Sequence, residues 1–364
     1  MAPRQPSTKP VGDAQIPRPS SSVLLISPTN QVLLLRRVQK TKNFPSAHVF
    51  PGGNLDPFHD GSIPDPSSPQ RHTDGEAYRL GAIRETFEES GILLARNNGF
   101  GRLLEVNDDD RAQGRHAVHS RAAPFAQWLA GKGGRADTSA LVPFTRWITP
   151  AFSATAKRFT TQMYLYFLPL PGPTSTSGGA TDRATTTGPN DAVAEVASER
   201  ETTIPPPTSD GGLEHTSAQF LHAGTWTEMA RTGEVILFPP QYFLLSLVAE
   251  CMPTPSPGRS YSLEELKSQR AKLREFVREG QWGERVISPM MVGQRDRRRV
   301  LSLHDPGLDE LRQGGVKGEW ERVVLADFRK EGPRDVEVKW RKDIEAEDGK
   351  PLKTGRDDRD TSKL

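Results

Sequence analysis

The chain lacks the features of a disulfide-stabilised or membrane-spanning protein. It has a single cysteine, Cys251, among 364 residues. An internal disulfide is therefore impossible, which fits a reducing compartment. No run of about 18 apolar residues is present that could span a bilayer, and residues 1–10 lack the apolar core of a signal peptide. These absences predict a soluble protein without a membrane span.

Net charge and apolar content are also low. The 48 basic and 46 acidic residues leave a formal charge of +2, which gives no general attraction to nucleic acid or membranes. The basic run at 295–299 is interpreted as a solvated patch. Only 34% of the residues are hydrophobic, and 31 are Pro and 32 Gly. Much of the chain is therefore expected to be loop or linker.

Against this background, residues 84–92 (RETFEESGI) carry a dense group of glutamates. With helical periodicity the apolar side chains fall on one side and the glutamates on the other. The apolar residues are Leu80, Ile83 and Phe87, and the glutamates are Glu85, Glu88 and Glu89. The pattern predicts a helix over about 74–90 that begins with a capping box of Thr73 and Glu76 and ends at Gly91.

Three carboxylates on one helix face repel one another by about 0.2–0.5 kcal/mol per pair. Hard oxygen ligands in such a cluster suit Mg²⁺ or Mn²⁺, which often act together with substrate phosphates. The alternative is a solvated acidic face. The surrounding sequence distinguishes the two.

Glu76, seven further residues and then RETFEESGI resemble the second part of the Nudix box, G-x5-E-x7-R-E-U-x-E-E-x-G-U, where U is apolar. Only Thr86 departs from this part, at the first U. The stretch FPGG (50–53) resembles the turn that opens the box, but it stands too far from Glu76. An insertion is therefore expected within 56–74, and its Pro, Ser and Asp content predicts a surface loop.

An insertion at this place is similar to one in a subgroup of the Nudix hydrolases, the peroxisomal coenzyme A diphosphatases related to the mammalian type 19 enzyme. Segments 32–53, 146–150, 157–168 and 238–249 resemble the same subgroup in similar order. The coenzyme A signature is met only in part. Leu33, Leu34, Arg37 and 50–53 fit it, whereas Leu35, Val38, Lys42 and Ser46 depart from it.

The resemblance implies an α/β fold, a Nudix-type α/β/α sandwich with a mixed sheet. It also implies hydrolysis of coenzyme A or acyl-coenzyme A, with Mg²⁺ or Mn²⁺, to 3′,5′-ADP and a 4′-phosphopantetheine product. Two alternatives stay open: a Nudix pyrophosphatase of another nucleoside diphosphate derivative, such as a dinucleotide or ADP-ribose, and a non-catalytic ligand-binding Nudix protein.

Carried over residue by residue, the resemblance assigns roles to named positions. The implied metal ligands are Glu76, Glu85, Glu88 and Glu89, and the implied catalytic residues are Arg84, Glu88 and Glu89. Gly52 and Gly53 would let the backbone approach the metal and the substrate, or else form an ordinary tight turn. Arg37, Lys42 and Arg158 are candidates to bind the substrate's phosphates, or else are solvated surface residues. Glu88, Glu89 and Glu214 all remain candidates for the general base. Arg84 would hold a glutamate of the box in place, or else form an exposed ion pair with Glu88. Glu76 could simply close the helix cap, and His48 is interpreted as structural.

Composition and pattern predict the domain organisation. Residues 1–19 should be flexible, 20–252 should form the Nudix domain with insertions at about 56–74 and 171–212, and 253–340 should be an extension packed on it. Residues 341–364 should be a disordered tail. This tail ends in Ser362, Lys363 and Leu364, a tripeptide that peroxisomal import receptors read, so the predicted location is the peroxisome.

Secondary structure is expected as follows. Residues 21–38 should form a hairpin, and 157–168 should form a central strand with one buried face. Helices are expected within 108–132, at 239–251 and at 260–280, the last with a Ser262–Glu265 capping box. A strand followed by a helix is expected in 213–230, and short strands over 284–340.

Overall fold

A mixed β-sheet forms the centre of the structure, a computed structural model that describes residues 16–38, 46–99, 102–151, 157–171, 206–208 and 215–352. In spatial order its strands are β10 (Val286–Ile287), β7 (Val142–Ile148), β8 (Phe159–Phe167), β1 (Arg18–Ile26), β2 (Val32–Arg37) and β3 (His48–Val49). β4 (Gly52–Asn54) also pairs with β1, and β9 (His215–Leu221) with β2. β1 is parallel to β8 and antiparallel to β2, which confirms the hairpin expected at 21–38.

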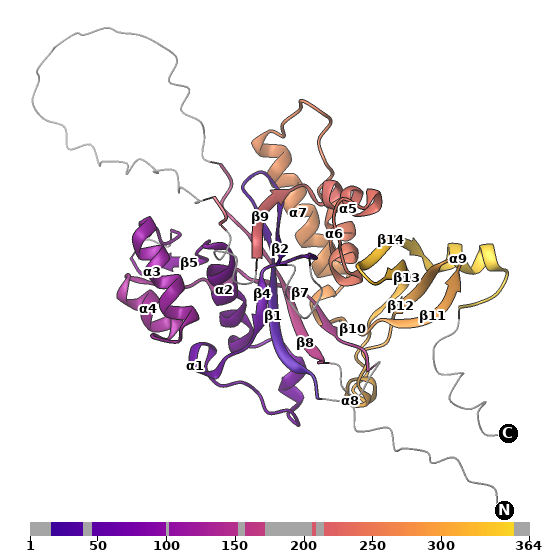
Figure 1. The fold of residues 1–364 in the computed structure, drawn as a ribbon, viewed down its shortest axis with the longest axis horizontal. Coiled ribbons are helices and arrows are strands. Elements are labelled where there is room, and N and C mark those ends of the chain that lie inside the picture. Colours follow the sequence, from indigo (N-terminus) through magenta and orange to yellow (C-terminus); the bar gives the residue numbers. More distant parts are fainter. Residues whose placement is uncertain are drawn as a thin grey trace, which may run out of the picture.

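Helices cover both faces of this sheet (Figure 1). One face carries α1 (Pro57–Asp60), α2 (Glu76–Ser90), α3 (Asp108–His119) and α4 (Phe125–Gly131); the other carries α5 (Ala223–Thr232), α6 (Pro239–Cys251) and α7 (Leu263–Glu279). Val23 and Leu25 of β1 pack on the α2 side, while Leu24 and Ile26 pack on the α6 side, because successive strand residues point to opposite faces. The predicted α/β/α sandwich is confirmed.

The prediction for the central strand was half right. β8 lies between β7 and β1, as expected. Both of its faces are buried, however, and not one. Met163 and Leu165 enter the core beneath α6, and Tyr164 and Tyr166 enter the core beneath α2. The alternation of apolar and more polar residues was misleading because Tyr164 and Tyr166 donate hydrogen bonds from their hydroxyls to the carboxylates of Asp74 and Asp137. These bonds allow both tyrosine side chains to be buried.

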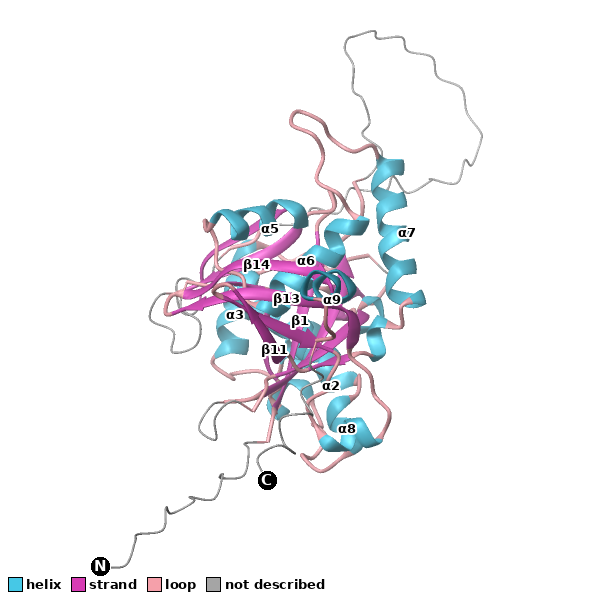
Figure 2. Ribbon diagram, turned by 90° about the vertical axis from the view of Figure 1, so that its right-hand side faces the viewer, coloured by secondary structure: helices cyan, strands magenta, loops and turns pink. Residues whose placement is uncertain are grey.

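A second, antiparallel sheet consists of β11 (Met290–Arg295), β12 (Arg298–Leu303), β13 (Glu319–Arg329) and β14 (Gly332–Trp340). One face joins the core under α6 through Leu301, Val324 and Val336. The other face is covered by α9 (Arg341–Asp348), which lies against β13 (Figure 2). The prediction of a disordered tail from residue 341 is therefore wrong for its first residues, which form α9 and are held by the buried Ile344. Residues 362–364, which carry the predicted import signal, lie outside the described residues.

Smaller elements complete the described chain: β5 (Ala95–Asn97), β6 (Gly134–Ala136), α8 (Asp309–Gln313) and the 3-10 turns η1 (Pro69–His72), η2 (Thr138–Ala140) and η3 (Trp282–Glu284). The 108–132 prediction is confirmed as two helices, α3 and α4. α6 begins at the expected proline, and α7 has the expected capping box of Ser262 and Glu265. In this part of the chain, no helix is long and apolar enough to cross a bilayer.

Two predictions around α2 were wrong. The helix is N-capped by Gly75 without a side-chain hydrogen bond, so Thr73 and Glu76 form no capping box. Thr73 instead closes η1, where its hydroxyl donates to the carbonyl of Gln70 (3.2 Å). The 56–74 insertion is also more than a surface loop, since it contains α1 and η1 and buries Asp60 and His72. Gly91 ends α2 in the left-handed conformation (φ 73°), as predicted.

α7 is tied to the hairpin between β1 and β2 by one buried arginine. Arg270 donates to Asn30 Oδ1 (2.8 Å) and to the carbonyls of Ser27 (2.7 Å) and Leu168 (2.7 Å). Asn30 itself adopts φ 59°, a left-handed conformation that asparagine tolerates. Because Ser27 and Leu168 directly follow β1 and β8, the arginine fixes α7 against the central sheet.

Candidate active site

The acidic face of α2 lies against the double glycine of β4. The backbone N–H of Gly52 donates to Glu89 Oε2 (2.8 Å). A Cβ at Gly53 would lie 2.5 Å from the carboxyl carbon of Glu85, and a Cβ at Gly52 would lie 2.3 Å from the carbonyl oxygen of Ser21. Only glycine lets the β4 backbone approach both β1 and the helix so closely. The predicted residues Gly52, Gly53, Glu85 and Glu89 are therefore brought together.

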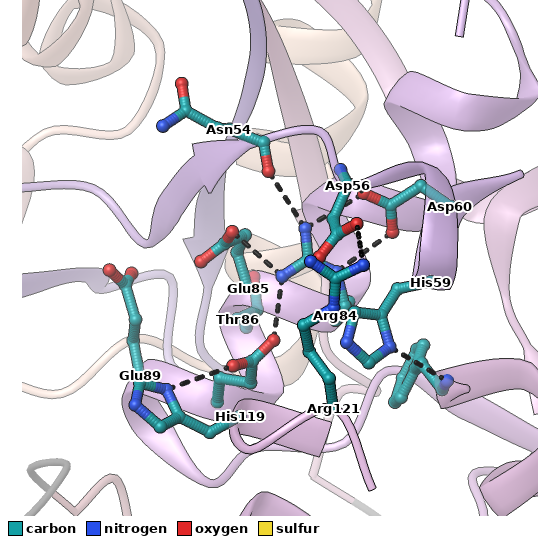
Figure 3. Close-up of polar contacts among 12 residues, drawn as sticks. Asn54, Asp56, His59, Asp60, Arg84, Glu85, Thr86, Glu89, His119 and Arg121 are labelled. Carbon is teal, nitrogen blue, oxygen red and sulfur yellow. Dashed lines mark hydrogen bonds and ion pairs between the residues drawn. The ribbon is translucent and has the colours of Figure 1, made fainter. Parts of the chain in front are cut away.

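Arg84 organises this cluster from within. Its side chain is almost fully buried, and all five of its N–H groups have acceptors (Figure 3). Nε and Nη2 donate to the two oxygens of Asp60 (both 2.9 Å), and Nη2 also donates to the carbonyl of Asn54 (2.9 Å). Nη1 donates to Glu85 Oε1 (2.9 Å) and Glu88 Oε1 (2.7 Å). The arginine therefore joins two glutamates of α2 to α1 and β4, and it is not the exposed ion pair that the sequence left as an alternative.

Asp60 is the partner that the sequence did not reveal. It lies in α1, within the stretch predicted to be a plain loop, and its carboxylate is fully buried. The backbone N–H of Asp56 donates to its Oδ2 (2.9 Å). Gly81 of α2 makes room for it, because a Cβ there would lie 3.0 Å from Asp60 Oδ2 and 2.5 Å from Leu55 Cδ2. The available signal was Asp56-Pro57, an N-cap followed by proline at the first helical position.

The electrostatics of the cluster follow from its burial. Removal from water, followed by the charge of Glu88, raises the pKa of Glu85 to about 7, although Arg84 opposes this rise. Burial lowers the pKa of Arg84, but the neighbouring carboxylates outweigh it, and the net shift is upward. Arg84 therefore stays charged, and a single positive side chain is shared by Asp60, Glu85 and Glu88.

Two histidines flank the glutamates. His119, at the end of α3, has Nδ1 3.4 Å from Glu88 Oε2, and His215, at the start of β9, has Nδ1 3.7 Å from Glu89 Oε1. Arg115 of α3 donates to the backbone carbonyls of Glu88 (2.7 and 2.9 Å) and Glu89 (3.2 Å), which attaches α3 to the last turn of α2. These residues are 26 to 126 positions away from the glutamates they face, which is why motif spacing did not identify them.

The remaining predicted residues do not all belong to this cluster. Glu76 is exposed in the first turn of α2, and the helical rise places it about 14 Å along the axis from Glu85. Arg158 is buried and donates to the carbonyl of Thr149 (2.9 Å). Arg37 pairs in register with His215, so the backbones of these two residues lie side by side near Glu89. Lys42 and Glu214 lie outside the described residues.

His48 fits its structural interpretation. It lies on β3, and its ring centroid is 5.5 Å from that of Trp226 in α5. Burial, followed by the charge of Arg36, lowers the pKa of His48 to about 4. The ring is therefore neutral near pH 7 and packs as part of the wall between β3 and α5.

The donor chemistry of the cluster fits a divalent cation. Carboxylate oxygens are the ligands that Mg²⁺ and Mn²⁺ prefer, and Glu85, Glu88 and Glu89 offer them from one side of α2, close to β4. Within the described ranges, no three Asp, Glu, His or Cys side chains already converge as a ligand set. The glutamates would therefore change rotamer to share one ion, and the excess of negative charge around Arg84 provides the attraction.

This chain is similar to known proteins over part of its length. Residues 65–211 match the family described as the NUDT19 Nudix domain, a range that contains α2 but not Gly52 or Asp60. A Xenopus laevis protein named acyl-coenzyme A diphosphatase NUDT19 is 31% identical over 176 residues, which cover 37% of this chain and 46% of that protein. A Homo sapiens protein of the same name is 29% identical over 185 residues, which cover 39% of this chain and 49% of that protein.

The chain thus spans about half the length of the curated relatives it matches. A solved structure, a NUDIX hydrolase from Alicyclobacillus acidocaldarius, aligns with a TM-score of 0.47 at 19% identity and covers 68% of this chain and 100% of its own.

Proposed function

We propose that this chain is a Nudix hydrolase, similar to NUDT19, that cleaves the diphosphate of coenzyme A or acyl-coenzyme A. The products would be 3′,5′-ADP and 4′-phosphopantetheine or its acyl derivative. One observation carries the proposal: the glutamates of α2, held by the buried Arg84, face the double glycine of β4. The substrate class is supported by the relatives named acyl-coenzyme A diphosphatase.

The residues of the site have different roles in the proposed reaction. Glu85, Glu88 and Glu89 would hold Mg²⁺ or Mn²⁺, which when bound offsets phosphate charge and acidifies a water molecule. Arg84 orients Glu85 and Glu88 through charge-assisted hydrogen bonds. The N–H of Gly52 orients Glu89. Glu88 or Glu89 would accept the proton of the attacking water, and Glu214 remains a third candidate for this role.

Product analysis tests this proposal directly. Purified protein is incubated with coenzyme A or an acyl-coenzyme A and Mg²⁺ or Mn²⁺, and the products are separated by chromatography. We expect 3′,5′-ADP and the matching phosphopantetheine, and we expect a chelator to abolish their formation. Hydrolysis of ADP-ribose or dinucleotides, but not of coenzyme A, would contradict the substrate class. No hydrolysis of any of these compounds would favour a non-catalytic binding protein.

We also propose that the protein acts in the peroxisome. The proposal is supported by the final Ser362, Lys363 and Leu364, a tripeptide that import receptors bind. A fluorescent fusion at the N-terminus should therefore co-localise with a peroxisomal marker, and removal of the three residues should leave it in the cytosol. Peroxisomal import of the truncated protein would contradict this proposal.

A further inference from the structure

The turn between α3 and α4 brings an arginine to the edge of the glutamate cluster. Arg121 lies in this turn with φ 58°, and its guanidinium points toward Asp56 and the Arg84 cluster (Figure 3). Its Nη2 is 3.4 Å from Asp56 Oδ1, and its guanidinium carbon is 5.1 Å from the ring centroid of Phe58. An aromatic ring and a carboxylate from the β4–α1 segment therefore hold the side chain in place.

The charge around the site shows why this position matters. Five carboxylates lie in this region: Asp56, Asp60, Glu85, Glu88 and Glu89. Arg84 uses all of its N–H groups on protein acceptors, and Arg115 directs its guanidinium to backbone carbonyls of α2. The side chain of Arg121, in contrast, is 58% exposed and is paired with Asp56. Arg121 is therefore a positively charged side chain at the edge of the glutamate cluster that a ligand can reach.

We propose that Arg121 is a substrate-binding residue that donates to phosphate oxygens. The planar guanidinium suits such oxygens because it can donate two parallel hydrogen bonds. Phe58 and Asp56 already hold the Arg121 side chain in position, so less side-chain conformational entropy would be lost when a phosphate binds. The inference rests on the proposed function. The phosphate could belong to the diphosphate that is cleaved or to a separate monophosphate of the same substrate, and the experiment distinguishes these two sources.

The test compares Arg121→Asn with wild type on coenzyme A and on dephospho-coenzyme A, which lacks the separate monophosphate. Asparagine tolerates the left-handed backbone of position 121, so the turn should be kept. We expect KM to rise about five- to tenfold with kcat changed less than about twofold, since a lost hydrogen bond between charged groups is of that size at an exposed site. A rise on coenzyme A alone assigns the monophosphate, and an equal rise on both substrates assigns the diphosphate.

Two controls complete the test. Arg278→Asn removes the same charge from an exposed position of α7, on the opposite face of the sheet, and should leave KM unchanged. Arg121→Lys keeps the charge without the planar fork and should recover part of the affinity. The inference is overturned if KM of Arg121→Asn stays within twofold of wild type on both substrates, if Arg278→Asn shows the same loss, or if only kcat falls.

Failure of the proposed function would be recognised separately. If wild type hydrolyses neither substrate, calorimetric titration with 3′,5′-ADP and Mg²⁺ replaces the kinetics. Weaker binding by Arg121→Asn than by wild type would then support a phosphate-binding role without catalysis. Equal binding, or no binding to wild type, would reject the inference.

Discussion

Replacement of Glu89 by glutamine is expected to lower kcat by about 100-fold or more, with little change in the melting temperature. Glutamine keeps an oxygen that can accept the hydrogen bond of Gly52, so the contact between α2 and β4 should survive. It loses the negative charge that would hold a divalent cation or accept a proton, and either role contributes on this scale. The measurements are steady-state hydrolysis of coenzyme A and thermal unfolding of the purified variant.

Glu76→Gln is the matched comparison on the same helix. The motif resemblance implies that Glu76 is a metal ligand, whereas the structure places it exposed in the first turn, away from Glu85. Because Glu76 lies away from the other glutamates, Glu76→Gln should keep kcat within about twofold of wild type. Equal losses in Glu76→Gln and Glu89→Gln would favour the motif assignment, and full activity of Glu89→Gln would remove that residue from the proposed mechanism.

Replacement of Asp60 by asparagine is expected to destabilise the protein by about 3 kcal/mol and to lower kcat more than tenfold. The change leaves the buried Arg84 without its bidentate partner, and removal of one member of a buried ion pair is costly. Arg84 would no longer be fixed against α1, so Glu85 and Glu88 would lose their common orientation. Denaturant unfolding gives the stability, and kinetics well below the melting temperature give kcat.

Asp108→Asn serves as the control for this second change. Asp108 forms an exposed ion pair with Arg111 (2.5 Å), which should contribute less than about 1 kcal/mol. A positioning role of Asp60 also predicts that the Mg²⁺ concentration for half-maximal activity rises, an effect that a general loss of stability would not produce. The proposed role would be rejected if Asp60→Asn matched wild type in stability, kcat and Mg²⁺ dependence.

Much of the framework around the site was predictable because it depends on local pattern. Helical periodicity identified α2, with Ile83 and Phe87 buried and the glutamates opposite. Gly91 marked its end through its left-handed conformation, and the Ser262–Glu265 box marked the start of α7. The double glycine of 52–53 was identified by motif, and the structure explains it by the close approach of β4 to β1 and α2.

The errors have a common physical origin. Thr73 and Glu76 had the spacing of a capping box, but η1 uses Thr73 for its own closure. Tyr164 and Tyr166 suggested an exposed strand face, but tertiary contacts supply buried acceptors for their hydroxyls. In each case a local preference was correct in kind, but another partner competed: the adjacent η1 turn for Thr73, and carboxylates distant in sequence for the two tyrosines.

The sequence by itself therefore determined the acidic helix and the chemistry its glutamates can support, since both depend on residues within a few turns, and its resemblance to the Nudix family implied the α/β/α class. Only the tertiary structure decided which groups surround those glutamates. Asp60 of α1 and His215 of β9 contact side chains of α2, and Arg121 of the α3–α4 turn contacts Asp56 beside α1, because the fold brings these distant segments together. No short-range spacing in the sequence indicates such contacts. Asp60, the partner of Arg84, and the exposed Arg121 could therefore be identified only from the fold.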